Sequence, residues 1–156
     1  MPQPVGTENP RNGMMCTPRL MEVKNGHIYF RMHPNIEAAF RKKLQKMEQR
    51  EIGKPYRLQL QLEHGEKLMI GGYQIIHEEN KIKTDRQLMF PQHTKFRTQC
   101  STPMLQGQAQ LDILVDHNII EIFINNGEYV ISNIIYEDNH DLKLPQGKTY
   151  CLWQMG

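Results

Sequence analysis

The chain has 156 residues, enough for one domain that buries about 68–70% of its unfolded surface, so its size does not require a metal, a disulfide or another cofactor. Its net charge is +2, and the basic residues are scattered apart from Arg41-Lys42-Lys43, so we expect no nucleic acid as a partner. No apolar run reaches the roughly 18 residues that span a bilayer, so we expect no membrane partner.

The first 15 residues are rich in Pro, Gly and Asn and are predicted to be a linker, followed by one domain over residues 16–156. They contain no apolar core of signal-peptide length. Three cysteines, Cys16, Cys100 and Cys151, are an odd number without C-x-x-C or metal-ligand spacing. The seven histidines are equally dispersed. We therefore predict reduced, mostly buried thiols, no metal site and a cytoplasmic location.

A hairpin and a helix are predicted in the first third of the domain. The hairpin joins strands at 21–24 and 27–31 through Asn25-Gly26, since Asn and Gly tolerate the positive φ angles of a tight turn. In residues 35–51 apolar side chains recur at intervals of three and four, which predicts an amphipathic helix with Asn35 as its N-cap and Gly53-Lys54-Pro55 as its stop. The polar face of this helix is expected to be solvated.

Short strands dominate the remainder. Residues 56–63 alternate apolar and polar, as a half-buried strand does. Further strands are expected at 68–70, 73–77, 81–84, 87–90, around 95–99 and at 148–155, with a loop over 137–146. Their number and spacing predict an all-β fold, a two-sheet antiparallel β-sandwich with one short peripheral helix.

Residues 111–136 are the most apolar part of the chain and predict a three-stranded meander. Turns at residues 116–118 and 125–127 interrupt the stretch. Asn126-Gly127 predicts a two-residue type I′ turn in which Glu128 pairs with Asn125.

This turn fixes the register of the meander. Ile122 should then oppose Ile131, Ile124 oppose Tyr129, Phe123 oppose Val130 and Glu121 oppose Ser132. If the earlier turn is a two- or four-residue loop, Val115 opposes Ile120 and Ile113 opposes Ile122. One face would be almost wholly Ile and Val. The other face mixes apolar residues with carboxylates, so we expect it to be covered by another surface.

The meander carries the pattern V-D-x-x-x-x-E-x-F-x-N-x-G, formed by Val115, Asp116, Glu121, Phe123, Asn125 and Gly127. This pattern resembles the signature of the C-terminal β-sandwich of glycoside hydrolase family 32, which includes invertases, sucrose-6-phosphate hydrolases, inulinases and levanases. Pro18-Arg19-Leu20 and Asp85-Arg86 match further family segments. His117 and Asn118 depart from the usual Arg and Ser of the family.

The resemblance implies a fold and a role. The carboxylates of these retaining β-fructofuranosidases lie in an N-terminal five-bladed propeller, in W-M-N-D-P-N-G, R-D-P and E-C motifs that this sequence lacks. The chain alone is therefore expected to contain no catalytic residue. It would pack on and support the propeller of an enzyme that hydrolyses the fructosyl linkage of sucrose, sucrose 6-phosphate or fructans, and could mediate homodimer formation. The motif residues would be structural or at the interface.

Other functions were weighed against this one. Asp116 and Glu121 share a face and could form a carboxylate pair, but Asp is favoured at a turn and Glu121 opposite Ser132 is more simply a structural or interface carboxylate. The alternative function is a lectin-like carbohydrate-binding module with Trp153 and Tyr150 stacking on sugar; a third is a homodimeric interaction protein. In the isolated chain we expect the meander face to be an exposed apolar patch that causes association, unless Phe123 and Val130 belong to the sandwich core.

Overall fold

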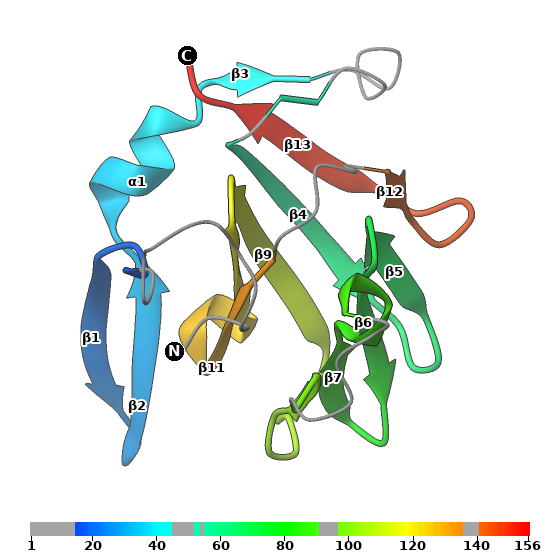
Figure 1. Ribbon diagram of the computed structural model, residues 1–156. Coiled ribbons are helices and arrows are strands. Elements are labelled where there is room, and N and C mark those ends of the chain that lie inside the picture. The colour runs from blue at the N-terminus through cyan, green and yellow to red at the C-terminus, as the bar shows by residue number, and fades with distance from the viewer. Residues whose placement is uncertain (1–14, 45–51, 54, 91–96, 136–140) are drawn as a thin grey trace.

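The computed structural model describes residues 15–44, 52–53, 55–90, 97–135 and 141–156. It is an all-β fold, as predicted, with a six-stranded sheet, a five-stranded sheet and a separate two-stranded hairpin (Figure 1). The six-stranded sheet has the order β11 (Tyr129–Ile134), β10 (Ile119–Ile124), β9 (Ala109–Asp116), β4 (Tyr56–Leu62), β13 (Tyr150–Gln154) and β3 (Lys42–Lys43). The five-stranded sheet has the order β12 (Leu142–Lys143), β5 (Lys67–Ile70), β6 (Tyr73–Glu78), β7 (Lys81–Asp85) and β8 (Gln99–Ser101).

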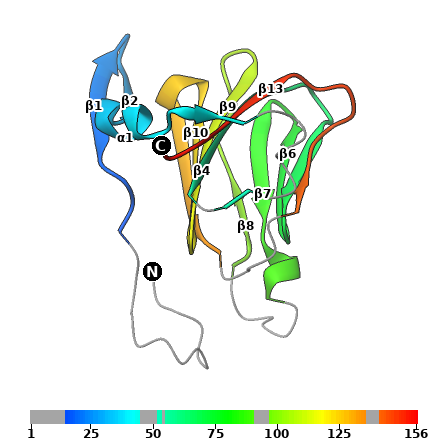
Figure 2. The ribbon, with the colours of Figure 1, turned by 90° about the horizontal axis from the view of Figure 1, so that it is seen from above.

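The two large sheets form the sandwich, and the hairpin lies outside it. The hairpin consists of β1 (Arg19–Lys24) and β2 (His27–Met32) and is followed by α1 (Pro34–Ala39). Figure 2 shows the hairpin and α1 on the outer side of the six-stranded sheet, with the five-stranded sheet on its other side. The chain therefore has three layers where the hairpin crosses the meander.

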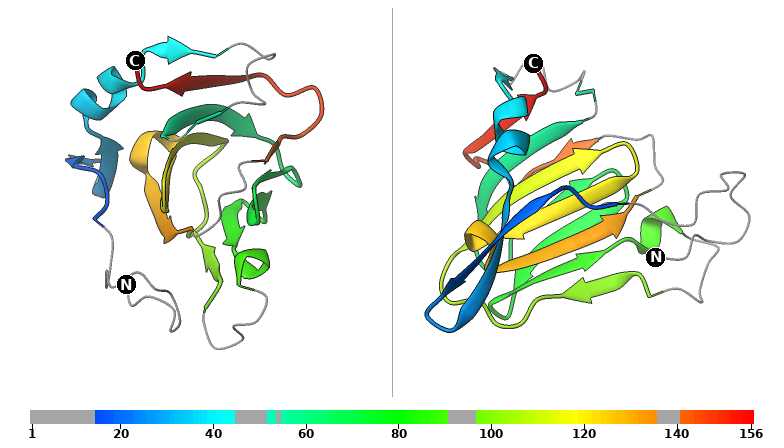
Figure 3. Two further views of the ribbon diagram at one scale, coloured as in Figure 1. Left: turned by 45° about the horizontal axis from the view of Figure 1, so that its top comes forward. Right: turned by 90° about the vertical axis from the view of Figure 1, so that its left-hand side faces the viewer.

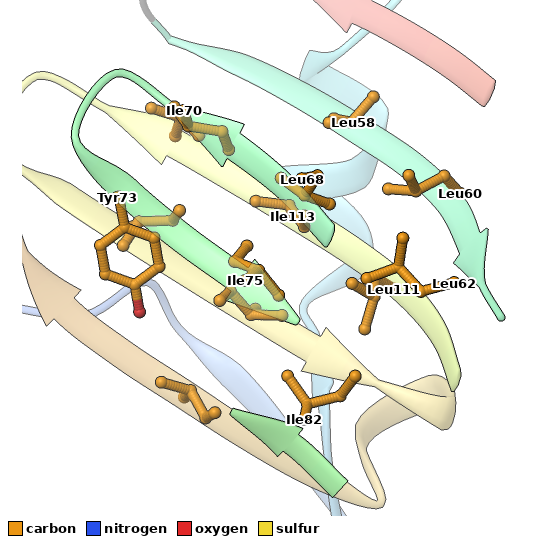
Figure 4. Packing of buried hydrophobic residues seen from close by; sticks show 14 of the residues in the cluster. Leu58, Leu60, Leu62, Leu68, Ile70, Tyr73, Ile75, Ile82, Leu111 and Ile113 are labelled. Carbon is orange, nitrogen blue, oxygen red and sulfur yellow. The ribbon is translucent and has the colours of Figure 1, made fainter. Parts of the chain in front are cut away.

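The main core fills the space between the two sheets. Strict alternation makes every second residue of β4 point inward, and the same rule applies to β6 and β7. Figure 4 shows the result, a layer of branched aliphatic side chains from both sheets that includes Leu58, Leu111, Ile113, Leu68, Ile75 and Ile82. Burial of this layer is the main stabilising contribution to the sandwich.

The register predicted for the meander is confirmed. Glu121 lies opposite Ser132 and Phe123 opposite Val130, and Ile122 lies between Ile113 and Ile131. The positive φ angles predicted for the two central residues of the turn are confirmed, since Asn126 has φ 57° and ψ 35° and Gly127 has φ 92°. Asn125 is also left-handed, with φ 49°, so residues 125–128 form a four-residue loop that contains the single-turn helix η3 (Asn125–Gly127).

The hairpin at Asn25-Gly26 is also confirmed, with φ 53° and 76° at the two turn residues. The helix prediction is wrong in length, because α1 ends at Ala39 and has His33, not Asn35, as its N-cap. Beyond it, β3 pairs with β13, and the Leu44 amide donates to the carbonyl of Leu152 at 2.8 Å. Residues 42–43 therefore pair with the edge of the sheet, although the spacing of apolar residues there is helical.

Three smaller differences concern loops. Residues 87–90 form no strand, because the Asp85 carboxylate accepts a hydrogen bond from the Gln87 amide and starts the single-turn helix η2 (Gln87–Met89). The predicted loop at 137–146 contains the short strand β12. The strand expected around 95–99 is found as β8, slightly later. Residues 1–14 of the predicted linker, 45–51 of the predicted helix, and 91–96 and 136–140 lie outside the described residues.

The outer face of the meander is covered by the chain itself, which corrects the expectation that this face is an exposed apolar patch. A second apolar cluster, separate from the main core, joins Phe123 and Leu114 of the meander to Met32 of β2 and to Phe40 after α1. Phe123 is only 2% exposed. In the right-hand view of Figure 3 the blue hairpin crosses in front of the yellow and orange meander strands.

The cysteines are all free, but the prediction that they are mostly buried is wrong. Cys16 is exposed, and Cys100 and Cys151 are half-buried. None of the described helices is long and apolar enough to cross a bilayer.

Candidate functional site

Glu121 is the centre of the contact between the meander and the segment that leads into β1. Its side chain is fully buried, and one carboxylate oxygen accepts hydrogen bonds from the amide of Thr17 at 2.9 Å and from its hydroxyl at 2.5 Å. The other oxygen forms a salt bridge with Arg19 Nη2, which also donates to the hydroxyl of Ser132 at 2.6 Å. A buried carboxylate requires such partners, because an unpaired charge away from water costs several kcal/mol.

Arg19 connects this polar contact to the second apolar cluster. Its guanidinium carbon lies 5.6 Å from the centre of the Phe123 ring, which is cation–π distance. Phe123 in turn packs in the cluster that contains Met32 of β2. Strand β10 therefore contacts both strands of the hairpin. The Glu121 carboxylate binds Arg19 of β1, and the Phe123 ring packs with Met32 of β2.

Gly127 allows the backbone of β2 to approach the meander turn. A Cβ atom at this position would lie 2.5 Å from the carbonyl oxygen of Phe30 and 2.6 Å from its carbonyl carbon. The residue also has φ 92°, where an L side chain is strained. Only glycine tolerates both the close approach of the Phe30 backbone and the positive φ angle. This explains why the V-D-x-x-x-x-E-x-F-x-N-x-G pattern ends in glycine.

Asn125 and Glu128 hold the turn in the shape that receives the hairpin. The Asn125 side chain donates to the Glu128 carboxylate at 2.7 Å and accepts from the Gln110 amide at 3.0 Å. The Glu128 carbonyl lies 2.8 Å from Nε2 of His27, which follows the hairpin turn. The His27 ring also packs edge-on against Tyr29 and Tyr129.

The E-x-F-x-N-x-G part of the pattern is thus one docking surface. Glu121 binds the segment before β1, Phe123 packs against β2, and Gly127 receives the backbone of β2, while Asn125 orders the turn. The sequence predicted that this face is covered but not that the covering segment belongs to the same chain. Thr17, His27, Phe30 and Met32 were not predicted as contacts, and the apolar residues of 27–31 gave no signal for them, since the side chains of Ile28 and Phe30 are exposed.

Beyond Arg19 and Met32, which contact the meander, the same face of the hairpin is exposed and apolar. Met21 pairs across the strands with Phe30, and Val23 pairs with Ile28. These four side chains are 68%, 41%, 67% and 48% exposed, respectively. Contiguous apolar side chains on a two-stranded ribbon mark a surface that another body covers.

The other predicted family residues lie elsewhere. Val115 is in the main core, and Pro18 is exposed between Thr17 and Arg19. The Asp116 carboxylate accepts from the backbone amide of His117 at 2.7 Å and contacts its imidazole at 2.8 Å, so the residue that replaces the family's usual Arg pairs locally.

Asp85 and Arg86 organise the edge of the five-stranded sheet. Arg86 Nη1 donates to the carbonyl of Ile134 at 3.0 Å and thereby links this sheet to β11. Burial raises the pKa of Asp85, but hydrogen bonds from Gln99 and from the Gln87 amide outweigh it and hold the pKa below its usual value. Asp85 is therefore an ionised turn carboxylate.

The two carboxylates weighed as a catalytic pair are on one face of the meander but in different environments. Asp116 is half-exposed at the turn, whereas Glu121 is buried and bound to Arg19. Among the described residues the Glu121 side chain has no exposed surface, and Thr17, Arg19 and Ser132 bind its oxygens. This geometry supports a structural role for Glu121 and no proton transfer to a substrate.

Trp153 and Tyr150, the predicted sugar-stacking residues, point to opposite faces of the six-stranded sheet. Tyr150 packs against the main core, and burial raises the pKa of its phenol. Trp153 packs against the second cluster, with the guanidinium carbon of Arg57 5.5 Å from its ring centre. The structure does not bring the two rings together.

A second polar cluster, absent from the sequence prediction, lies beside Trp153. Arg57 donates to both oxygens of Asp112, at 2.8 and 2.6 Å, and Gln59 donates to the same carboxylate. Hydrogen bonding to Asp112 raises the pKa of Arg57. Within the part of the chain that the structure describes, no group of three His, Cys, Asp or Glu side chains could hold a metal ion.

The two facing antiparallel sheets, with a hairpin clamped to the outer face of one of them, define the class of the protein, a β-sandwich domain. A family model described as "Glycosyl hydrolases family 32 C terminal" matches residues 31–149. The chain therefore belongs to glycoside hydrolase family 32, as its C-terminal domain. A comparison with curated proteins finds no match.

Two solved structures share the fold. A sucrose-6-phosphate hydrolase from Lactobacillus gasseri aligns over 88% of this chain, with a TM-score of 0.69 and 22% identity. An exo-inulinase from Aspergillus awamori aligns over 97%, with a TM-score of 0.68 and 14% identity. The chain spans only 33% and 37% of the lengths of those two proteins.

Proposed function

We propose that this chain is the supporting C-terminal sandwich of a β-fructofuranosidase and that it docks on the catalytic propeller through the exposed apolar residues of the β1–β2 hairpin. The observation that carries the proposal is the hairpin itself, which is clamped to the sandwich by Glu121 and Phe123 and still leaves Met21, Val23, Ile28 and Phe30 exposed. The role of Glu121 is then to set the position of the hairpin relative to the sandwich.

The position of the hairpin in the chain supports this assignment. Residues 1–15 lead into β1, so a catalytic domain that precedes them in sequence is tethered beside the hairpin. Tethering gives even a modest apolar contact a high effective concentration. In the isolated chain the same apolar face would favour homodimers, because no partner covers it.

The parent enzyme would hydrolyse the fructosyl linkage of sucrose, sucrose 6-phosphate or fructans, with retention through two carboxylates of the propeller. This chain supplies no group to that reaction. Free thiols in all three cysteines are compatible with the cytoplasmic location that we propose.

The test is reconstitution. A catalytic domain of a sucrose-6-phosphate hydrolase, produced without its sandwich, is incubated with and without this chain, and hydrolysis of sucrose and sucrose 6-phosphate is followed during heating. We expect no hydrolysis by the chain alone and a longer half-life of activity in the mixture. Hydrolysis by the chain alone, or an unchanged half-life, would refute the supporting role.

A further inference from the structure

Two adjoining hollows lie on the outer side of the six-stranded sheet, and the second is bordered by the hairpin. The first, of about 280 Å³, lies over β4 and β9 and is lined by residues that include Glu37, Arg57 and Asp112. The second, of about 380 Å³, lies between Tyr29 of the hairpin and η3. Gln110 and Asn126 line both, so the two hollows adjoin, and together they are called the groove below. Its size is that of small-ligand sites.

Side-chain amides dominate this groove. Gln59, Gln106, Gln108, Gln110, Asn125 and Asn126 line one hollow or both. Among the described residues, no hydrogen bond engages the side-chain amides of Gln106, Gln108, Gln110 or Asn126. An amide offers a donor and an acceptor at fixed spacing, which matches neighbouring hydroxyls that both donate and accept.

The charges of the groove select against anions. Arg57 is its one cation among the described lining residues, and Asp112 and Glu37 already bind it. Glu128 adds a further carboxylate, which is engaged by Asn125 and by the Gln106 amide. The groove is therefore neutral to negative, so a phosphate ester would meet carboxylates without a free cation.

Tyr29 supplies an apolar platform. It lines the second hollow and is half-buried, and its ring is held edge-on by His27 at 4.9 Å between centroids. A ring fixed in this way loses little conformational entropy when a ligand packs on it. An aromatic ring flanked by amides suits a ligand with apolar C–H faces and many hydroxyls.

From these features we propose that the groove binds a neutral carbohydrate chain, with its amides on the hydroxyls and Tyr29 on a sugar face. The choice of fructosyl units as the sugar rests on the proposed function. The site is distinct from the Trp153–Tyr150 pair suggested by the sequence, and it would let the sandwich hold a fructan near the enzyme without touching the reacting bond.

The experiment uses the single Trp153 as a reporter, because Arg57 lines the groove and lies over the Trp153 ring. The whole chain is titrated with short inulin-type oligofructose and, separately, with fructose 6-phosphate, and amide chemical shifts are recorded in parallel. We expect saturable binding of oligofructose at millimolar concentration, on the order of −4 kcal/mol, and weaker binding of the phosphate ester.

Variants locate the site. Gln110→Ala and Tyr29→Ala should each raise the oligofructose Kd about tenfold, the effect of one lost hydrogen-bonding or stacking group. Gln110 is exposed, so its variant should fold normally. Gln74→Ala, in a polar hollow on the other sheet, is the matched control and should leave the Kd unchanged. Absence of saturable binding, an unchanged Kd in both groove variants, or a loss only in Gln74→Ala would overturn the proposal.

The outcome is independent of reconstitution with the catalytic domain. Sugar binding is measured on this chain alone, whereas the supporting role is measured as stabilised hydrolysis in the mixture. If the chain stabilises the catalytic domain but binds no oligofructose, only the groove proposal fails. If it binds oligofructose but does not stabilise the catalytic domain, only the supporting role fails.

Discussion

Glu121 and Arg19 are 102 residues apart in the chain, and their salt bridge joins the middle strand of the meander to the first strand of the hairpin. The carboxylate is fully buried, while the guanidinium remains partly accessible. This asymmetry means that Glu121 depends on the hairpin for its partners. If the hairpin detaches, a buried carboxylate loses both Thr17 and Arg19, so the hairpin and the sandwich should separate only at a high cost in free energy.

Glu121→Gln should lower the free energy of unfolding by about 3 kcal/mol, because the amide cannot balance the charge of Arg19 or accept from all of its present donors. Urea unfolding followed by circular dichroism measures the loss. Glu22→Gln is the matched control, since Glu22 forms only an exposed pair with Arg31, and it should change stability by less than about 0.5 kcal/mol. Equal losses in the two variants would contradict the role assigned to Glu121.

Gly127→Ala should destabilise the chain by about 3 kcal/mol, from left-handed strain together with the clash against the Phe30 backbone. Gly65→Ala separates the two causes, because Gly65 has φ 83° but nothing within 4 Å of the added Cβ, and it should cost only about 1–2 kcal/mol. Thermal unfolding of both variants is the measurement. If Gly127→Ala costs no more than Gly65→Ala, the hairpin does not press on the turn as described.

Met21→Ser combined with Val23→Ser should make the isolated chain more soluble and more monomeric, since both side chains are largely exposed on the hairpin. Light scattering after size exclusion reports the association state. Phe123→Ser, by contrast, should cost about 3–5 kcal/mol or unfold the chain, because Phe123 is buried in the second cluster. A folded, more soluble Phe123→Ser variant would contradict the burial of the meander face.

The chain should lose stability at alkaline pH, because the phenols of Tyr56 and Tyr73 are buried. Burial raises the pKa of Tyr73 from 10.0 to about 12, and burial raises that of Tyr56 further. The folded state thus holds these protons more tightly than the unfolded state does. Stability from this source is fully present below pH 10.0, the unfolded value, and is lost as the pH rises through the folded pKa values.

Phenylalanine variants test this pH dependence and separate the two residues. The fall in stability above pH 10.0 should be smaller in Tyr73→Phe and smaller still in the double variant with Tyr56→Phe. At neutral pH, Tyr73→Phe should cost about 1 kcal/mol, because it removes the acceptor of the Asn133 amide. Tyr56→Phe should be neutral or stabilising there, since the Tyr56 hydroxyl has no partner among the described residues. An unchanged alkaline profile would contradict the burial of both phenols.

The sequence predicted the sandwich well, because period-two alternation in β4 and Asn-Gly turns are local signals with a direct physical cause. It failed at residues 40–44, where a helical repeat of apolar residues conceals a change of environment. Ile36 and Phe40 pack in the second cluster, but Leu44 packs in the main core, and β3 joins a sheet edge. The spacing of apolar residues along the chain does not show pairing with a distant strand such as β13.

The docking surface was predicted only in part. Glu121 and Phe123 stood out by the mixture of charge and apolar character on one strand face, which indicated a covering surface. Nothing local in the sequence relates Glu121 to Thr17 or Gly127 to Phe30, because those contacts join segments about 100 residues apart. The sequence therefore predicts a covering surface from a different domain, whereas the β1–β2 hairpin of this chain covers the face.

The central claim is that the exposed apolar residues of the hairpin receive the catalytic domain. Hydrogen–deuterium exchange of this chain, with and without a catalytic domain of a related sucrose-6-phosphate hydrolase, tests it most directly. The account predicts that addition slows exchange of the amides in β1 and β2 and leaves β6, β7 and β8 unchanged. Slower exchange on β6–β8 with none on the hairpin, or no change anywhere, would contradict it.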